Sequence, residues 1–126
     1  MSPRAAGATQ HELSRIGLLA TLSGETLAKL AQSMTREEVP AGTTVVSEGE
    51  EGDRFYVVLN GMLSVGQRDR GQQGMLRPGD YFGEVALAMH TPRTASVRAV
   101  TPATLASCDR GTFEQYIRPL FADDAS

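Results

Sequence analysis

Two side chains of opposite charge lie within the stretch of residues 82–99. Glu84 has a carboxylate, which only accepts hydrogen bonds and can therefore take one from a sugar hydroxyl. Arg93 has a guanidinium, which stays ionised and presents a planar fork of N–H groups to phosphate oxygens. Between them, a helical turn over residues 85–89 would leave its first backbone amides free for an anion. The stretch therefore predicts a site for a ligand that carries both a ribose and a phosphate.

The composition limits what else the chain can be. Its 126 residues, 40% hydrophobic and 21% charged, fit one soluble globular domain with a single core. The formal net charge of −3 argues against a nucleic-acid partner, so an anion site has to be local. The single cysteine, Cys108, excludes a framework of internal disulfides. The sequence has no membrane-spanning run and no secretory signal, so we expect a cytoplasmic protein without direct membrane insertion.

Helices are expected before the β-rich part of the chain. Residues 1–8 have no periodicity and are predicted to be a disordered tail. Thr9 and Glu12 have the spacing of a capping box and predict a helix start. Helices are expected to occupy residues 9–35, because apolar residues recur on one helical face: Leu27, Leu30, Ala31 and Met34.

Residues 42–109 consist of short β-rich runs separated by turn residues. Asn60-Gly61 has the signature of a two-residue hairpin, because a type I′ turn needs a positive φ at both central residues. Many short strands at regular spacing are typical of a sandwich or barrel. A final helix over residues 109–120 is predicted, with Asp109 as its N-cap and Pro119 limiting its length.

Two blocks of this sequence resemble a known family. The first block is Gly42…Glu48-Gly49-Glu50…Gly52-Asp53…Phe55-Tyr56-Val57-Val58-Leu59-Asn60-Gly61…Leu63-Ser64-Val65. The second block is Phe82-Gly83-Glu84…Ala86-Leu87…Pro92-Arg93-Thr94-Ala95-Ser96-Val97. Together they resemble the cyclic nucleotide-binding domain of catabolite activators, protein kinase A regulatory subunits and cyclic nucleotide-gated channels. The second block resembles its phosphate-binding cassette, here residues 82–96.

The resemblance implies a mainly β fold with flanking helices, in one domain over residues 9–126. That fold is an eight-stranded antiparallel β-roll of the jelly-roll type, also called a double-stranded β-helix. The β-roll would occupy residues 42–109, with N-terminal helices, a short cassette helix and a short C-terminal helix. Many family members have a further long helix as a lid over the base, and this chain lacks room for it, so Phe121 is a candidate substitute cap.

The resemblance also implies roles for individual residues. Glu84 would bind the ribose and Arg93 the exocyclic phosphate oxygens. Leu87 would transmit the signal by packing against the final helix, through Phe113, Tyr116 and Ile117. His90 stands where many relatives have glycine. The predicted ligand-binding residues are Phe82, Gly83, Glu84, Val85, Ala86, Arg93, Thr94 and Ala95.

Each role has a plainer alternative. Glu84 could be a solvated acid at a helix N-terminus, and Arg93 could form a surface ion pair, for instance with Glu84. An aromatic such as Phe82 between a turn and a helix is more often part of the core. In the family, a hydroxyl residue at the position of Thr94 can assist cGMP but also occurs in members that respond to cAMP. The ligand is therefore cAMP or cGMP, and family frequency favours cAMP.

We expect a regulatory module without catalysis that binds a cyclic nucleotide and signals to a protein effector or a fused domain. One alternative is a nucleotide-independent interaction domain that keeps the fold; the intact Glu84 and Arg93 argue against it. Another is a metal-dependent jelly-roll enzyme of the cupin type. That enzyme would need clustered ligands, whereas His11 and His90 are the only histidines, so no metal site and no further cofactor are expected.

Overall fold

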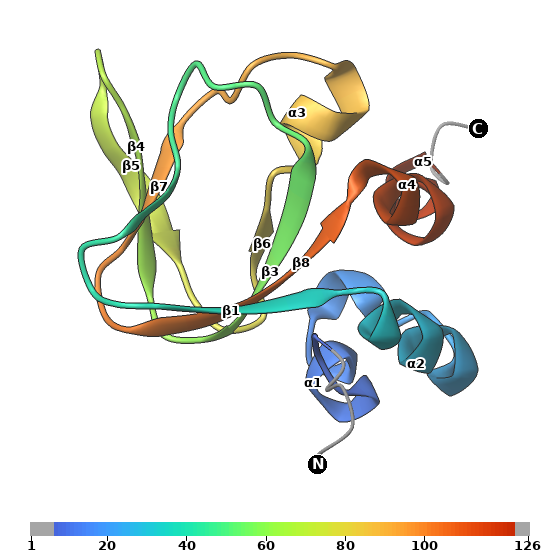
Figure 1. The fold of residues 1–126 in the computed structure, drawn as a ribbon. Coiled ribbons are helices and arrows are strands. Elements are labelled where there is room, and N and C mark those ends of the chain that lie inside the picture. The colour runs from blue at the N-terminus through green and yellow to red at the C-terminus, as the bar shows by residue number, and fades with distance from the viewer. Residues whose placement is uncertain (1–6, 123–126) are drawn as a thin grey trace.

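The computed structural model describes residues 7–122 and begins with a group of short helices (Figure 1). The predicted capping box is present, because the Thr9 hydroxyl accepts a hydrogen bond from the N–H of Glu12 and the Glu12 carboxylate accepts one from the N–H of Thr9. Residues 1–6 of the predicted tail lie outside the described residues. Ala8 is not part of a disordered tail, since it is 1% exposed in a cluster with Leu13. The helical elements are α1 (Gln10–Ser14), the 3-10 turn η1 (Gly17–Leu19) and α2 (Gly24–Gln32).

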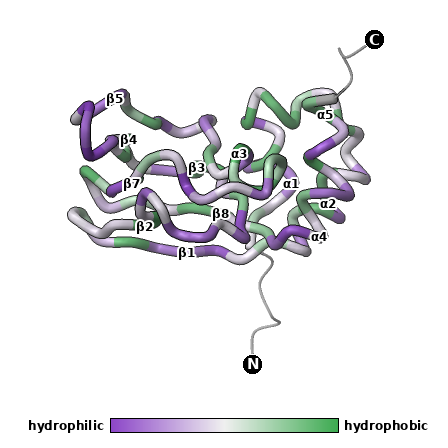
Figure 2. The backbone as a smooth tube through the Cα atoms, turned by 90° about the horizontal axis from the view of Figure 1, so that it is seen from above, coloured by the Kyte–Doolittle hydropathy of each residue, from purple (hydrophilic) through white to green (hydrophobic). Residues whose placement is uncertain are grey.

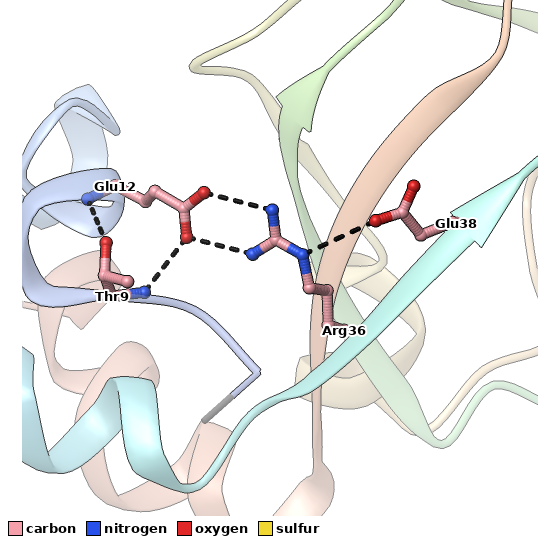
Figure 3. Close-up of polar contacts among 4 residues, drawn as sticks. All are labelled: Thr9, Glu12, Arg36 and Glu38. Atoms are coloured by element: carbon pink, nitrogen blue, oxygen red, sulfur yellow. Dashed lines mark hydrogen bonds and ion pairs between the residues drawn. The ribbon is translucent and has the colours of Figure 1, made fainter. Parts of the chain in front are cut away.

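The helical region ends earlier than predicted. After α2, Thr35–Val39 forms strand β1 at the edge of a sheet. The sequence pattern conceals this strand because three of its five residues are charged, which suits an edge that must not pair with another chain. Arg36 of this strand forms an ion pair with Glu12 of α1 at 3.0 Å, and its Nε lies 3.7 Å from the carboxylate of Glu38 (Figure 3).

Within residues 7–122, eight strands form two four-stranded antiparallel sheets, which confirms the predicted β-roll with flanking helices (Figure 1). The first sheet has the order β1-β8-β3-β6 and the second the order β2-β7-β4-β5. Strands that follow each other in the chain often lie in different sheets, as in a jelly roll. The other strands are β2 (Thr44–Val46), β3 (Arg54–Asn60), β4 (Leu63–Gln67), β5 (Gly71–Leu76), β6 (Tyr81–Phe82), β7 (Ser96–Ala99) and β8 (Ala103–Asp109).

The predicted hairpin at Asn60-Gly61 is wrong in its pairing. β3 pairs with β8 and β6, whereas β4 pairs with β5 and β7, so the chain changes sheets at this turn. Gly61 does have the expected positive φ, 87°, and a Cβ there would clash with the carbonyl oxygen of Pro102. The turn chemistry is as predicted, but it does not determine which strands pair.

Strand β3 is buried on both faces and separates two hydrophobic clusters. Phe55 and Val57 belong to a cluster shared with the N-terminal and C-terminal helices. Tyr56 and Val58 point the other way, into the interior of the roll, because successive side chains of a strand alternate. Figure 2 shows β1, β2, β4, β5 and β7 on one side of the molecule and α1, α2, α4 and α5 on the other. One strand thus contacts both the helices and the inside of the roll.

The C-terminal helix begins where predicted but continues through Pro119. The Asp109 carboxylate caps it by accepting a hydrogen bond of 2.9 Å from the N–H of Thr112. Pro119 does not end it, because a π-helical turn before the proline already interrupts the regular ladder; there the N–H of Arg118 donates to the carbonyl of Phe113. Its segments are α4 (Arg110–Thr112), the π turn η2 (Phe113–Ile117) and α5 (Arg118–Ala122). No helix within residues 7–122 is both long and apolar enough to cross a membrane.

Candidate functional site

A cavity of about 200 Å³ lies between strand β4 and two segments of the predicted stretch, residues 81–86 and 93–97. The sequence pattern misses three of its lining residues, Val65, Tyr81 and Val97. Tyr81 and Val97 each adjoin residues 82–96, whereas no signal in the sequence links Val65 on β4 to the site. All eight predicted ligand-binding residues line the cavity: Phe82, Gly83, Glu84, Val85, Ala86, Arg93, Thr94 and Ala95.

Helix α3 (Glu84–Met89) is preceded by an N-cap residue, Gly83, that has to be glycine. Gly83 has a φ of 100°, in the left-handed region that side chains disfavour. A Cβ on Gly83 would lie 2.7 Å from the carbonyl oxygen of Arg54 and 2.9 Å from Nη1 of Arg93. Both the backbone conformation and the close approach therefore require glycine here, and the close approach brings α3 against Arg93.

Arg93 is the most unusual residue of the site, because its charged side chain is buried. The residue is 7% exposed, and its guanidinium carbon lies 6.0 Å from the centre of the Tyr56 ring. Its Nη2 donates a hydrogen bond of 3.0 Å to the carbonyl of Arg54, and its Nη1 one of 3.5 Å to the carbonyl of Gly83. Among residues 7–122, no carboxylate forms an ion pair with it, so a surface ion pair is excluded for this part of the chain.

The protein environment leaves the charge of Arg93 only partly compensated. Burial is the largest influence and lowers the pKa of the Arg93 guanidinium, while Tyr56, Asp53, Glu50 and Glu84 act in the opposite direction. A buried charge without an ionic partner is costly, and an anion entering the cavity would remove that cost. The site is therefore suited to an anionic group.

The loop before β3 holds the backbone of Arg93 from the other side. The N–H of Arg93 donates to the carbonyl of Glu50 at 2.7 Å, and the N–H of Gly49 donates to the carbonyl of Arg93 at 2.8 Å. A Cβ on Gly52 would lie 2.7 Å from both Nε of Arg93 and Cβ of Ala86. The first sequence block thus acts structurally, by seating the arginine of the second block.

Glu84 and Thr94 differ in exposure. Glu84 is half-buried, and its carboxylate makes no hydrogen bond or ion pair to any residue within 7–122. Thr94 is exposed, and its carbonyl accepts a hydrogen bond of 2.9 Å from Nε2 of Gln67 on β4. The cavity therefore offers one acceptor without a partner and one cation without an anion.

Comparison with known families shows which family this chain belongs to. Residues 36–119 match the family model of the cyclic nucleotide-binding domain. The chain belongs to this family. The matched residues include strands β2–β8, most of β1 and the stretch 82–96.

Individual relatives extend the comparison. The cAMP-dependent protein kinase regulatory subunit of Eremothecium gossypii is 39% identical over 108 residues, which are 86% of this chain and 24% of that protein. The chain thus spans about a quarter of the length of the curated relatives it matches. The regulatory domain of Toxoplasma gondii protein kinase A with cAMP has a TM-score of 0.84 and 26% identity, covering 92% of this chain and 48% of that one. The regulatory subunit of a cAMP-independent protein kinase A from Trypanosoma brucei has a TM-score of 0.85 and 27% identity, covering 90% and 42%.

Helix α3, within the stretch 82–96, is packed against the C-terminal helix. Leu87 of α3 is fully buried in the same cluster as Phe113 and Ile117, with Tyr116 packed at its edge. Arg110 adds a polar contact that the sequence analysis missed, because a single arginine near a helix start carries no recognisable pattern. Its Nη1 donates a hydrogen bond of 2.8 Å to the carbonyl of Leu87.

Two further residues that the sequence singled out, His90 and Phe121, do not line the cavity of about 200 Å³. His90 ends α3 with a φ of 55°, the conformation that glycine adopts easily, and is exposed. Phe121 does not line the cavity; its ring packs 5.8 Å from the ring of Tyr81 and 6.5 Å from that of Phe113. Phe121 therefore supports Tyr81, which does line the cavity.

Two other observations concern alternative sites. A larger cavity of about 520 Å³ lies between α1, β3 and the turn at Pro78, but none of the predicted binding residues lines it. Its charged wall includes Glu12 and Arg36, which already pair with each other. Within residues 7–122, no three His, Cys, Asp or Glu side chains form a group that could hold a metal ion. The cavity of about 200 Å³, the cassette cavity, is the candidate site because all eight predicted residues line it.

Proposed function

We propose that this domain binds cAMP in the cassette cavity and acts as a regulatory module without catalysis of its own. The observation that supports this most strongly is the buried Arg93 guanidinium, which pairs with no carboxylate among residues 7–122. The cyclic phosphate would supply the missing negative charge. Arg93 would bind its exocyclic oxygens through the planar fork of N–H groups.

The other groups of the nucleotide would also find partners in the cavity. The Glu84 carboxylate would accept a hydrogen bond from the ribose 2′-hydroxyl, because an ionised carboxylate has only acceptor atoms. Gly83 would let the backbone approach the ligand closely. Backbone N–H groups would donate to the phosphate from Ala86, Thr94 and Ala95, while Phe82 and Val85 would border the sugar and base.

We favour cAMP over cGMP as the ligand. The Eremothecium gossypii relative is named as cAMP-dependent, and the Toxoplasma gondii structure contains cAMP. The hydroxyl of Thr94 is compatible with either base, so cGMP is the competitor to include in every binding experiment.

The signal would leave the site through the C-terminal helix. Leu87 and the backbone of α3 contact that helix, so a change in α3 on ligand binding would shift it. A ligand favours whichever state binds it better, and the helix would present that state to a protein effector or a fused domain in the cytoplasm.

Calorimetry with cAMP and cGMP tests this function on wild type, Arg93→Ala and Arg98→Ala. Arg93→Ala should weaken cAMP binding by about 2–5 kcal/mol, because the phosphate loses its buried charge partner. Arg98→Ala is the matched control, since Arg98 is exposed on β7 and donates to the carbonyl of Gly42, away from the cavity. Equal affinities in wild type and Arg93→Ala would exclude the proposed phosphate contact.

A nucleotide-independent interaction domain is the second candidate. The Trypanosoma brucei structure favours it, because that regulatory subunit has the same fold and is named as cAMP-independent. A thermal-shift screen separates the two functions. cAMP at 100 times its dissociation constant should stabilise a binding-competent domain by about 2.7 kcal/mol, whereas an interaction domain should show no shift with any cyclic nucleotide.

A further inference from the structure

The position of the Arg93 guanidinium depends on where strand β3 begins. Of its two hydrogen bonds to the protein, the shorter goes to the backbone carbonyl of Arg54, at 3.0 Å, and the longer to that of Gly83, at 3.5 Å. Arg54 is the first residue of β3. Whatever holds this strand end in place therefore also holds the guanidinium in place.

The side chain of Arg54 ties the strand end to two neighbouring strands. Its Nε donates a hydrogen bond of 3.0 Å to Oγ of Ser107 on β8, and its Nη2 one of 3.3 Å to Oγ1 of Thr35 on β1. The first residue of a strand has few ladder hydrogen bonds and tends to open locally. The side chain thus adds an attachment at the end of the ladder, where Arg54 pairs with Asp109 of β8.

Ser107 connects this attachment to a carboxylate. The residue is fully buried, and its hydroxyl accepts from Arg54 while it donates a hydrogen bond of 2.9 Å to Oε2 of Glu37 on β1. Both functions of the hydroxyl are therefore satisfied, as a buried polar group requires. The Ser107 hydroxyl thus links the guanidinium of Arg54 to the carboxylate of Glu37. Glu37 accepts this hydrogen bond and forms no ion pair with Arg93.

That engagement matters because a carboxylate paired with Arg93 would compete with a ligand phosphate. Glu37 lies near Tyr56, the aromatic neighbour of Arg93, because Ser107, which donates to Glu37, is the partner of Tyr56 in the pairing of β3 with β8. Burial first and the charge of Glu37 second raise the pKa of the Tyr56 hydroxyl. The cluster of Arg54, Ser107 and Glu37 therefore lies next to the phosphate site while leaving Arg93 free of an anion.

We propose that Arg54, held by Ser107 and Glu37, is a positioning residue for Arg93. Arg54 does not line the cavity of about 200 Å³, so it acts through Arg93 and not by touching the ligand. It keeps the guanidinium ordered before a ligand arrives, and phosphate binding then needs little rearrangement. The inference rests on the proposed function only in its last step, the contact between Arg93 and a phosphate.

NMR of the nucleotide-free protein tests the positioning directly. The Nε–Hε signal of Arg93, assigned by its absence from Arg93→Lys, should be sharp in wild type and broadened in Arg54→Met. Ser107→Ala should broaden it less, because Thr35 still accepts from Arg54. Arg98→Met, which removes an exposed arginine from β7, should leave the signal unchanged.

Affinity for cAMP supplies the second measurement. Arg54→Met should weaken binding about tenfold, because a less ordered Arg93 would lose part of its charge-assisted contact with the phosphate, and Arg54→Lys should recover part of the loss by restoring the cation. An Arg93 signal and an affinity unchanged in Arg54→Met would overturn the proposal. If Arg54→Met does not fold, Ser107→Ala and Arg54→Lys decide by the same signal. Failure of wild type to bind any cyclic nucleotide would overturn the proposed function alone, because the Arg93 signal is read without ligand.

Discussion

The guanidinium of Arg110 donates a hydrogen bond of 2.8 Å to the carbonyl of Leu87, in the last turn of α3. Its Nη2 donates a second one, of 3.3 Å, to the carbonyl of Gly52 in the loop before β3. α3 and this loop are the two segments that enclose Arg93. One side chain at the start of the C-terminal helix therefore contacts both segments that surround Arg93.

Replacing Arg110 with methionine should destabilise the domain. Two part-buried carbonyls would lose a charged donor, and hydrogen bonds to charged groups contribute about 1.5–3 kcal/mol each. Urea unfolding measures the loss. Arg118→Met is the control: it removes one exposed bond to the carbonyl of Ala88 and an ion pair with Glu114, and should cost less than about 1 kcal/mol. Equal losses in the free energy of unfolding of the two variants would show that the hydrogen bonds of Arg110 stabilise the domain no more than the exposed contacts of Arg118.

Gly83→Ala should damage both stability and binding. Its φ of 100° is unfavourable for alanine, and the new Cβ would approach the carbonyl of Arg54 to 2.7 Å, so the backbone next to Arg93 would have to move. A strained residue of this kind costs about 1–3 kcal/mol. Gly74→Ala on β5 is the matched control, because its φ is not positive and a Cβ there meets no atom within 4 Å. Thermal unfolding and cAMP titration of both variants give the comparison, and similar behaviour would contradict the assigned role of Gly83.

The family is predictable from the sequence because two short blocks, within residues 42–65 and 82–97, carry its resemblance. The eight candidate ligand-binding residues lie in one continuous stretch, and their role in binding stays a prediction. Residues 82–96 contain both charged groups of the cavity, and local turn and helix chemistry suffices to place Glu84 near Arg93. Val65 escapes the prediction because its place in the cavity depends on the pairing of β4 with β7, which brings together residues far apart in the chain.

The errors in the fold prediction have the same origin. Asn60-Gly61 carries the local signature of a hairpin, yet the partners of β3 are β6 and β8, whose sequences lie far downstream. Strand β1 is too polar to be recognised from its hydrophobic pattern. Its position is fixed by its pairing with β8 and by the ion pair between Arg36 and Glu12. Pro119 is expected to limit the final helix, but a π turn over Phe113–Ile117 precedes it and helical structure continues to Ala122.

Leu87→Ala should destabilise the domain more than any change on the exposed side of α3. Leu87 is fully buried in the cluster shared with the C-terminal helix, and removing a buried leucine side chain costs about 2–5 kcal/mol. Met89→Ala, in the same helix but 67% exposed, should change the free energy of unfolding by less than about 0.5 kcal/mol. Chemical denaturation of the pair measures the difference. A small effect of Leu87→Ala would mean that α3 does not depend on packing against the C-terminal helix.

Acid should remove the stabilisation that Glu12 provides. The hydrogen bond from Arg36 is the main cause that lowers the pKa of the Glu12 carboxyl below its ordinary value of 4.5 (Figure 3). A carboxyl whose pKa is lower in the folded state stabilises the fold above its unfolded pKa, and this contribution disappears as pH falls through the folded pKa. Wild type should therefore exceed Glu12→Gln in stability at neutral pH, with a difference that shrinks below pH 4.5. Glu25→Gln, at an exposed residue 3.9 Å from Lys29, is the control and should cost less stability at neutral pH than Glu12→Gln.

Cys108 should be unreactive in the folded protein. Its side chain is fully buried on β8, and burial, with a smaller contribution from Asp109, raises the pKa of the thiol to about 12. Only the thiolate attacks disulfide reagents, so a raised pKa and a blocked approach act together. An aromatic disulfide reagent at pH 8 should label Cys108 in urea but not in buffer, with Cys108→Ser as the blank. The labelling rate in buffer should then rise in Leu87→Ala, since Leu87 belongs to the same cluster as Cys108 and its loss favours opening. Rapid labelling of the folded wild type would show that β8 opens without unfolding of the domain.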